Sequence, residues 1–315
     1  MPILIGIDEA GLGPNLGPYV VTATVWETPD SSDECDLWRA FAKVATSSPS
    51  TDDRRLHIGD SKAVFQPGRG LAALERGVLA AAGLLHDGRN LTDRCLRRLL
   101  APDDGELPAD HWYAGDHVKL PVETCGKDLR RMTARWAKIL ERTGIRLRAI
   151  HSTLLEPTRF NALIDVHQNK AHALSLVSLN LLKRATAAAE GQQIVACCDK
   201  HGGRNYYDQM LSECFDDAFV FRVCESAELS VYRLGSLEVR FQPRAEVHFP
   251  VALASMVSKY VRELAMLRFN RFWMSQVPDL KPTQGYPVDA RRFREAIASQ
   301  QQSLRIPDSQ LWRCR

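Results

Sequence analysis

The stretch Ile3-Leu-Ile-Gly-Ile-Asp-Glu-Ala-Gly-Leu-Gly-Pro14 opens the chain with an apolar run that leads into two adjacent acids and a glycine-proline loop. Its β-branched isoleucines alternate with Leu4 and Gly6, which predicts a strand buried on both faces. Two consecutive carboxylates at the end of such a strand repel each other and resist desolvation. A divalent cation would compensate for that repulsion; the alternative is an exposed strand end with two solvated acids.

Neighbouring residues on a strand point to opposite faces, so Asp8 and Glu9 serve one site only if the strand ends or bends there. Gly11 and Gly13 permit such a bend, and they also let the backbone approach a ligand closely. We therefore expect a strand end, a turn and a ligand-binding loop within a dozen residues.

Composition narrows the class of protein. The chain has 315 residues, of which 45% are hydrophobic and 25% charged, enough for one large domain or two small ones. There is no apolar run of about 18 residues, so we expect no membrane association, and no secretory leader is visible, so we expect a cytoplasmic protein. The eight cysteines are scattered and indicate reduced thiols, and a net charge of +3 does not by itself identify a nucleic-acid binder.

The pattern along the chain predicts an α/β fold with a mixed central sheet flanked by helices. Residues 1–26 indicate two strands, and a polar stretch over 27–51 indicates a loop with a short helix near 37–44. Residues 87–125 indicate an insertion rather than core. Further elements are a helix with one basic side at 127–142, a strand at 146–152, one long helix at 157–189, a strand ending at Asp199, strands within 219–241, a long helix at 251–273 and a short terminal helix within 290–315.

Two later acids repeat the pattern of Asp8. Asp199 ends the apolar strand Gln193-Ile-Val-Ala-Cys-Cys-Asp199, and Glu246 precedes the small-residue helix start Val251-Ala-Leu-Ala-Ser255. Because sites in α/β proteins gather at the carboxyl ends of strands, these acids are candidate partners of Asp8.

The chain resembles type 2 ribonuclease H, the ribonuclease HII/HIII family. Five motifs carry the resemblance, in the order of the family and over nearly the whole chain: Gly6-Ile-Asp-Glu-Ala-Gly-Leu-Gly-Pro14, Asp60-Ser-Lys62, Asp199 with Gly202 and Tyr207, Ala245-Glu-Val-His-Phe-Pro-Val-Ala-Leu-Ala-Ser-Met-Val-Ser-Lys259, and Gly285-Tyr-Pro-Val-Asp289.

The resemblance implies one ribonuclease H-like catalytic domain over residues 1–315, with insertions near 27–56 and 87–125 and a helical extension from about 274. It also implies an endonuclease that hydrolyses the RNA strand of RNA–DNA hybrids. In that family four carboxylates hold two Mg²⁺ or Mn²⁺ ions, and by position they would be Asp8, Glu9, Asp199 and Glu246. The paired ions activate water and stabilise the leaving oxygen.

Two positions depart from the family pattern. Most ribonuclease HII members carry Asp where this chain has Glu246, and Glu263 is a second candidate for the fourth acid. The family's ribonucleotide-sensing loop is typically Gly-Arg-Gly, whereas this chain has Gly11-Leu12-Gly13. Leucine donates no side-chain hydrogen bond, so sensing of the 2′-hydroxyl must then depend on backbone N–H groups and neighbours.

Other residues would contact substrate by resemblance. Tyr286 would stack on the sugar; the alternative is a turn tyrosine in a Gly-Tyr-Pro bend. Ser61 and Lys62 match the family's substrate-side pair, or else form a capped helix start. Lys259 and Ser255 would face phosphate. Histidines at 201 and 248 are expected to be structural.

Two classes of function remain open: a metal-dependent hybrid endonuclease, and a non-catalytic or altered member that binds hybrid or structured nucleic acid. A binding module gains nothing from a cluster of negative charge facing phosphates, which favours the first.

Overall fold

The computed structural model describes residues 1–29, 36–50, 52–66, 68–86, 91–101, 111–115, 117–187, 189, 191–201, 204–216 and 218–314. Within these residues, seven strands form one mixed sheet in the order β5-β2-β1-β6-β9-β8-β7. Their bounds are β1 Ile3–Ala10, β2 Tyr19–Glu27, β5 Arg146–Leu155, β6 Ile194–Asp199, β7 Phe221–Glu225, β8 Ser230–Leu234 and β9 Leu237–Gln242. A separate two-stranded sheet joins β3 Ala45–Thr46 to β4 Leu56–His57.

The centre of the large sheet has the features that the first residues predict. Strand β1 is buried on both faces except at Glu9, and it pairs antiparallel with β2 and parallel with β6. Strand β6 in turn runs parallel to β9. The predicted mixed sheet is therefore confirmed, and three adjacent parallel strands, β1, β6 and β9, end on the same side of it.

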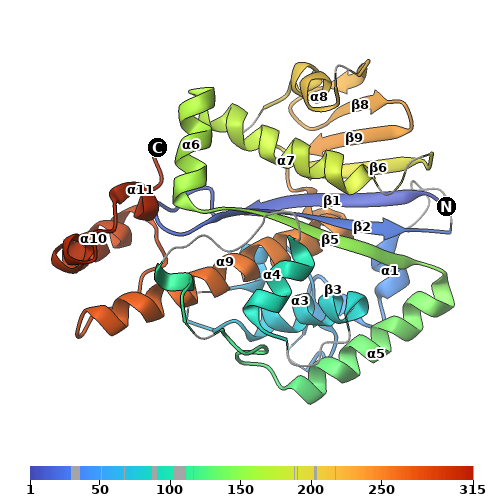
Figure 1. The fold of residues 1–315 in the computed structure, drawn as a ribbon. Helices are drawn as coiled ribbons and strands as arrows, with labels where there is room; N and C mark the ends of the chain where they lie inside the picture. The colour runs from blue at the N-terminus through green and yellow to red at the C-terminus, as the bar shows by residue number, and fades with distance from the viewer. Residues whose placement is uncertain are drawn as a thin grey trace.

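Helices cover both faces of the sheet (Figure 1). One face carries α1 Leu37–Phe41, α2 Ser61–Val64, α3 Ala72–Leu85, α4 Asp93–Leu100, α5 Gly126–Thr143 and α9 Phe249–Gln276. The other face carries α6 Pro157–His167, α7 Lys170–Ala187 and α8 Asp208–Cys214. Short helices η2 His111–Tyr113 and η3 Ala245–Val247 connect elements, and α10 Pro287–Ser303 and α11 Asp308–Leu311 pack on the distal half of α9.

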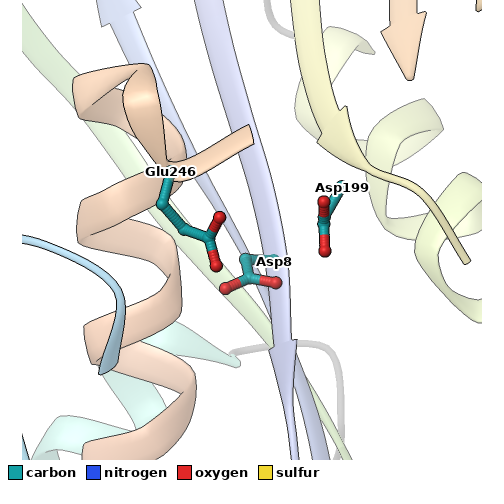
Figure 2. A group of neighbouring side chains, drawn as sticks. All are labelled: Asp8, Asp199 and Glu246. Carbon is teal, nitrogen blue, oxygen red and sulfur yellow. The ribbon is translucent and has the colours of Figure 1, made fainter. Parts of the chain in front are cut away.

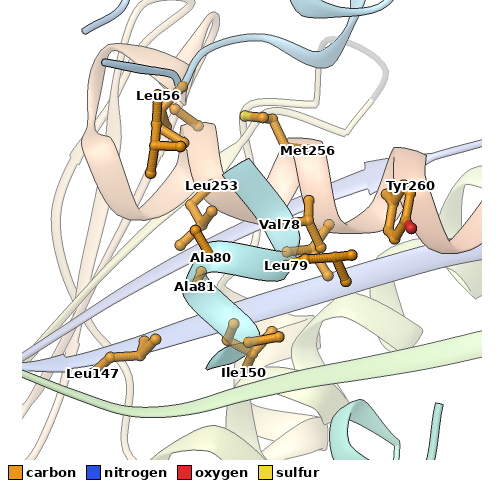
Figure 3. Close-up of a cluster of buried hydrophobic side chains, with 14 of the residues drawn as sticks. Leu56, Val78, Leu79, Ala80, Ala81, Leu147, Ile150, Leu253, Met256 and Tyr260 are labelled. Atoms are coloured by element: carbon orange, nitrogen blue, oxygen red, sulfur yellow. The ribbon is translucent and has the colours of Figure 1, made fainter. Parts of the chain in front are cut away.

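On the α9 face, the hydrophobic core lies between α3, α9 and the large sheet. Figure 3 shows Val78, Leu79 and Ala81 of α3 together with Leu253 and Met256 of α9 and with side chains of β5. All of these side chains are buried, and burying a large aliphatic side chain contributes about 1.5–3 kcal/mol. The core thus fixes α9, the helix that follows Glu246.

Segment 87–125 differs from its prediction as an insertion outside the core. Among its described residues, Leu91, Leu96, Leu100, Val118 and Leu120 are buried in the same cluster as α3 and α9. The buried carboxylate of Glu75 accepts hydrogen bonds from the N–H groups of three consecutive residues, Val122, Glu123 and Thr124. That buried carboxyl group attaches the segment to α3, a long-range contact that composition does not reveal.

The prediction of one helix over 157–189 is wrong. Helix α6 ends where Gln168 adopts a left-handed conformation with φ 52°, and α7 starts two residues later. The side chain of Asn169 accepts a hydrogen bond from the N–H of His172 and so caps the second helix. The C-terminal part also contains more helix than expected, because α10 begins at Pro287 and α11 follows it. None of the helices in the described parts of the chain has the length and apolar character that a membrane span requires.

Strand β1 and helix α9 approach each other closely at Gly6. A methyl group on Gly6 would lie 2.2 Å from both the carbonyl carbon of Pro250 and the nitrogen of Val251. Both are backbone atoms, so no side-chain adjustment relieves the clash, and only glycine allows this contact.

We therefore expect Gly6→Ala to lower the free energy of unfolding by about 3 kcal/mol or more, because the strand and the helix must separate. Denaturant unfolding followed by circular dichroism measures the loss. Gly126→Ala is the matched control, since its methyl group would meet only the end of the Arg130 side chain, at 3.6 Å. Equal stability of the two variants would contradict the close packing.

Candidate active site

Strand register brings two of the predicted acids together. In the parallel pair of β1 and β6, Ile7 lies beside Cys198, so the next residues, Asp8 and Asp199, are at the same level. Asp199 is also the last residue of β6, paired with Gln242 at the end of β9. The carboxyl ends of three neighbouring strands therefore meet here, as Asp199 predicts from its position in the sequence.

The third acid comes from the connection between β9 and α9. Arg244 has φ 57°, a left-handed conformation that turns the chain back over the strand ends. Glu246 follows in η3, and the N–H of Ala245 donates to Asp199 Oδ1 at 3.4 Å. On the far side of η3, the Trp38 indole N–H donates to the Val247 carbonyl at 2.8 Å, which attaches the connection to α1.

Asp8, Asp199 and Glu246 form one cluster, with a carboxylate oxygen of each lying within 4.8 Å of the others. Figure 2 shows the three side chains pointing toward one another from β1, β6 and the segment before α9. Asp8 is buried, and the other two are half-buried. The residues that the sequence proposes as metal ligands are thus brought together, apart from Glu9.

Glu9 lies beside this cluster, and its role as a metal ligand stays a prediction. The expected strand end after Asp8 is absent, because β1 continues to Ala10. Glu9 is outside the three-acid cluster, yet the charge of Asp199 affects its pKa more than that of any other residue. It is therefore an adjacent acid rather than a fourth member of the cluster.

Burial and like charge govern the electrostatics of this site. Burial, followed by the charge of Glu9, raises the pKa of Asp8 well above its usual range, and a hydrogen bond from Ser255 opposes the rise. Burial and the charge of Asp199 raise the pKa of Glu9 to about 7, and burial also raises the pKa of Glu246. Lys62 lowers the pKa of both glutamates, so its positive charge acts on the site.

Helix α9 supports Asp8 directly. Besides the side-chain contact of Ser255, the hydroxyl of Ser258 donates to the Asp8 carbonyl at 3.0 Å. The Ser255 hydroxyl also accepts the N–H of Ser61 at 3.2 Å, and Asp60 caps α2 by accepting from the N–H of Lys62 at 2.9 Å. Ser61 is therefore a buried structural contact, whereas Lys62 is exposed beside the acids. Sequence analysis missed Ser258, although its spacing of three residues from Ser255 places it on the same side of the helix.

Glu263 and Lys259 lie together, away from the three-acid cluster. Lys259 Nζ is 2.6 Å from Glu263 Oε1 and 4.5 Å from the centre of the Phe65 ring, and Arg262 Nη1 is 3.3 Å from the same carboxylate oxygen. Glu263 therefore already has two cationic partners. Of the two candidates for the fourth family acid, only Glu246 lies in the cluster.

The glycine loop, residues 11–18, follows β1 and meets the segment that contains Tyr286. The N–H groups of Asn15 and Leu16 donate to the Gly285 carbonyl at 2.7 and 3.3 Å. A methyl group on Gly13 would lie 3.8 Å from Tyr286 Cε1. Leu12 and Tyr286 are 46% and 48% exposed, so both side chains are accessible to a ligand.

The first three amides of the glycine loop are free to act as donors. Among the described residues, no acceptor pairs with the N–H of Gly11, Leu12 or Gly13. Loop residues with unused N–H groups beside an exposed aromatic ring can bind a polar ligand.

The two histidines near the acids contact neighbouring side chains of the fold. His201 is held between Tyr207 and Phe241, and burial lowers its pKa to about 4. His248 contacts Gln242 through Nε2 at 3.1 Å. Tyr207 stacks on Phe241 with ring centres 3.7 Å apart, and its hydroxyl accepts a hydrogen bond from the backbone N–H of His201 at 3.1 Å. Gly202, named in the same motif, lies outside the described residues.

No protein-family model matches the sequence, and no curated protein matches it. The chain is similar to a chain of the PCNA:RNase HII complex from Archaeoglobus fulgidus, with 16% identity, a TM-score of 0.43 and coverage of 99% of this chain and 94% of that one. It is also similar to ribonuclease H2 from Pyrococcus horikoshii OT3, with 13% identity, a TM-score of 0.43 and coverage of 98% and 92%. A third similar structure is Bst-RNase HIII in complex with Mn²⁺, with 14% identity, a TM-score of 0.43 and coverage of 98% and 65%. Sequence identities of 13–16% and TM-scores of 0.43 do not assign a function to this chain.

The raised pKa of Glu9 has a consequence for stability in the metal-free protein. Folding shifts this pKa from 4.5 to about 7, so the folded state holds the proton more tightly than the unfolded state. The stabilisation is complete below about pH 4.5 and is lost as the pH rises through 7. Glu9→Gln should remove up to about 3 kcal/mol of this pH dependence.

Thermal unfolding with a chelator at several pH values measures the effect, with Glu295→Gln on the exposed side of α10 as the control. If Glu9→Gln follows the pH profile of the wild type, folding does not raise the pKa of Glu9.

Proposed function

We propose that this protein is a metal-dependent endonuclease that hydrolyses the RNA strand of RNA–DNA hybrids. The observation that carries the proposal is the cluster of Asp8, Asp199 and Glu246, whose carboxylate oxygens lie within 4.8 Å of one another. These acids stand in the motifs that resemble type 2 ribonuclease H. An acidic cluster alone is common on proteins; an acidic cluster built from the ends of parallel strands in that motif order is far more specific.

The donor set fits a divalent cation. Mg²⁺ and Mn²⁺ prefer carboxylate oxygens. A cation between three such groups would offset both the burial and the like charge that raise the pKa values of Asp8 and Glu246. Asp8, Asp199 and Glu246 would hold one ion. Glu9 would be the donor for a second ion, since it lies beside the cluster and the charge of Asp199 raises its pKa. When bound, such ions neutralise phosphate charge and lower the pKa of a water molecule.

Other residues of the chain would bind and orient the nucleic acid. The unused N–H groups of Gly11, Leu12 and Gly13 would donate to the sugar-phosphate backbone or to 2′-hydroxyl groups. The exposed ring of Tyr286 would stack on a sugar next to the cleaved bond. Lys62 would add a positive charge beside the acids, whereas Lys259 would reach phosphate only by leaving Glu263.

A protein that binds hybrid or structured nucleic acid without cleaving it is the second candidate function. The three-acid cluster speaks against it, because negative charge facing phosphates weakens binding unless a cation is present. The two functions differ in their response to removal of one acid.

Asp199→Asn keeps the size of the side chain and removes its charge. We expect cleavage of a labelled hybrid with Mg²⁺ or Mn²⁺ to fall at least about a hundredfold, since a ligand of the metal is lost. Hybrid affinity should stay equal or increase, because less charge repels the phosphates.

Asp208→Asn is the matched control. Asp208 of α8 pairs with Arg222 of β7 and is absent from the cluster. Near wild-type turnover in Asp199→Asn would rule out the proposed metal site. If the wild-type protein binds the hybrid tightly but does not cleave it, the result would favour the second function.

Tyr286→Ala should reduce turnover by roughly one to two decades, because stacking of an aromatic ring contributes about 1–3 kcal/mol. Tyr286→Phe retains the ring and should lose much less. Steady-state kinetics and thermal unfolding on both variants decide the role. Equal losses of stability with full activity would make Tyr286 a turn residue only.

The leucine at position 12 predicts a preference between RNA tracts and single ribonucleotides within DNA. A single ribonucleotide within DNA offers one 2′-hydroxyl, whereas an RNA tract offers several hydroxyls and an A-like minor groove. We expect faster cleavage of hybrids with consecutive ribonucleotides than of duplex DNA with one, and Leu12→Arg should narrow the difference. Initial rates on both substrates test this, and Val288→Arg, at a position that is 88% exposed beside Tyr286, controls for added charge. Faster cutting at the single ribonucleotide would mean that the loop amides suffice.

A further inference from the structure

Two buried arginines lie beneath the glycine loop, and the proposed chemistry uses neither. Arg262 of α9 is 1% exposed and Arg313, two residues after α11, is 3% exposed. Arg262 Nη2 donates to the carbonyls of Leu16 at 3.3 Å and Gln284 at 2.9 Å. One guanidinium therefore connects the glycine loop to the segment that precedes Tyr286.

Arg313 holds the other side of the same loop. Its Nη2 donates to the Pro14 carbonyl, and its backbone N–H donates to the Asn15 carbonyl at 3.0 Å. Asn161 of α6 fixes this part of the chain, with its amide donating to the Trp312 carbonyl at 2.7 Å and its carbonyl accepting the N–H of Cys314 at 2.7 Å. The C-terminal segment 312–314 thus reaches the loop through backbone and side-chain contacts.

Both arginines are unfavourable as purely structural residues. Burial lowers the pKa of Arg262, and burial together with the charge of Arg262 lowers the pKa of Arg313 to about 9. Among the described residues, Nε of both arginines and Nη1 of Arg313 have no hydrogen-bond partner. Glu263 pairs with Arg262 and partly compensates its charge. The buried donors without partners and the repulsion between the two cations still destabilise the fold, a cost that apolar side chains of similar volume would not carry.

The contacts of the two arginines orient the backbone of the glycine loop. Because buried guanidiniums hold the carbonyls of Pro14 and Leu16, this half of the loop is turned toward the protein interior. The N–H groups of Gly11 to Gly13 remain unpaired in the part of the chain that the structure describes. Gly11 itself packs on Arg262, since a methyl group there would lie 2.9 Å from Arg262 Cδ and Nε.

We propose that Arg262 and Arg313 are positioning residues that hold the glycine loop and Tyr286 in the geometry that binds the nucleic acid, so that the C-terminal segment 312–314 is part of the substrate site. This inference rests on the proposed function for the identity of the ligand. It assigns neither arginine a contact with substrate.

Arg313→Met tests the proposal, because methionine fills much of the volume and removes every donor. We expect the amides of Asn15 and Leu16 to exchange with solvent about tenfold faster or more, while amides of the β1 and β6 core keep their protection. The KM for a hybrid should rise about tenfold with kcat within about threefold, since binding is lost more than chemistry. Affinity for Mn²⁺ should stay unchanged, because the acids are held by α9 and the sheet.

Arg291→Met is the control, as Arg291 is exposed on α10. Arg313→Lys, which keeps the charge and one donor, should give intermediate exchange and KM, and it replaces Arg313→Met as the test if that variant does not fold. Unchanged loop exchange, or an equal increase of exchange across the whole protein, would overturn the positioning role. If the wild type cleaves no hybrid, the proposed function fails separately, and loop exchange together with hybrid binding by fluorescence anisotropy still decides whether Arg313 positions the loop.

Discussion

The direct backbone contact between β1 and α9 at Gly6 is the constraint on which the rest of the site depends. At this point Pro250 and Val251 occupy the space that any side chain would need. The helix then runs along the strand, and its polar residues reach successive parts of one segment: Ser255 the side chain of Asp8, Ser258 the carbonyl of Asp8, and Arg262 the glycine loop. A single helix thus sets the separation between the acidic cluster and the loop.

The cost of this arrangement is electrostatic. Three carboxylates share a small volume at the ends of β1, β6 and the segment before α9, and burial raises the pKa of two of them. The network around Asp8 contains hydroxyl donors, and Lys62 acts on the glutamates from solvent. No lysine or arginine is an ion-pair partner of these three acids among the described residues, so the charge is left for a ligand to balance. Clusters of this kind indicate a functional site, because apolar residues would stabilise the fold better than buried carboxylates.

Sequence reasoning succeeded where the signal is local. The alternation in Ile3 to Ile7 predicts a buried strand, the apolar run before Asp199 predicts a strand end, and both are observed. The expected position of Glu246 just before a long helix also agrees with the structure. Motif order adds what periodicity cannot, namely that these acids belong to one site.

It failed where distant parts of the chain decide the outcome. The break at Gln168 lies in an otherwise continuous helical pattern, and the core role of segment 87–125 depends on the buried carboxylate of Glu75. The strand end expected after Asp8 is also absent, because pairing with β2 extends β1 through Ala10. The contact of Arg313 with Pro14 spans 299 positions, and no pattern in the sequence indicates it.

The central claim is that Asp8, Asp199 and Glu246 converge to bind a divalent cation. Diffraction at the manganese absorption edge, from crystals equilibrated with Mn²⁺, locates such an ion without reference to activity. The account predicts an anomalous peak within about 2.0–2.6 Å of oxygens from all three carboxylates, the range for hard cations with oxygen ligands. A peak elsewhere with this cluster empty, or no peak at saturating Mn²⁺, would contradict it.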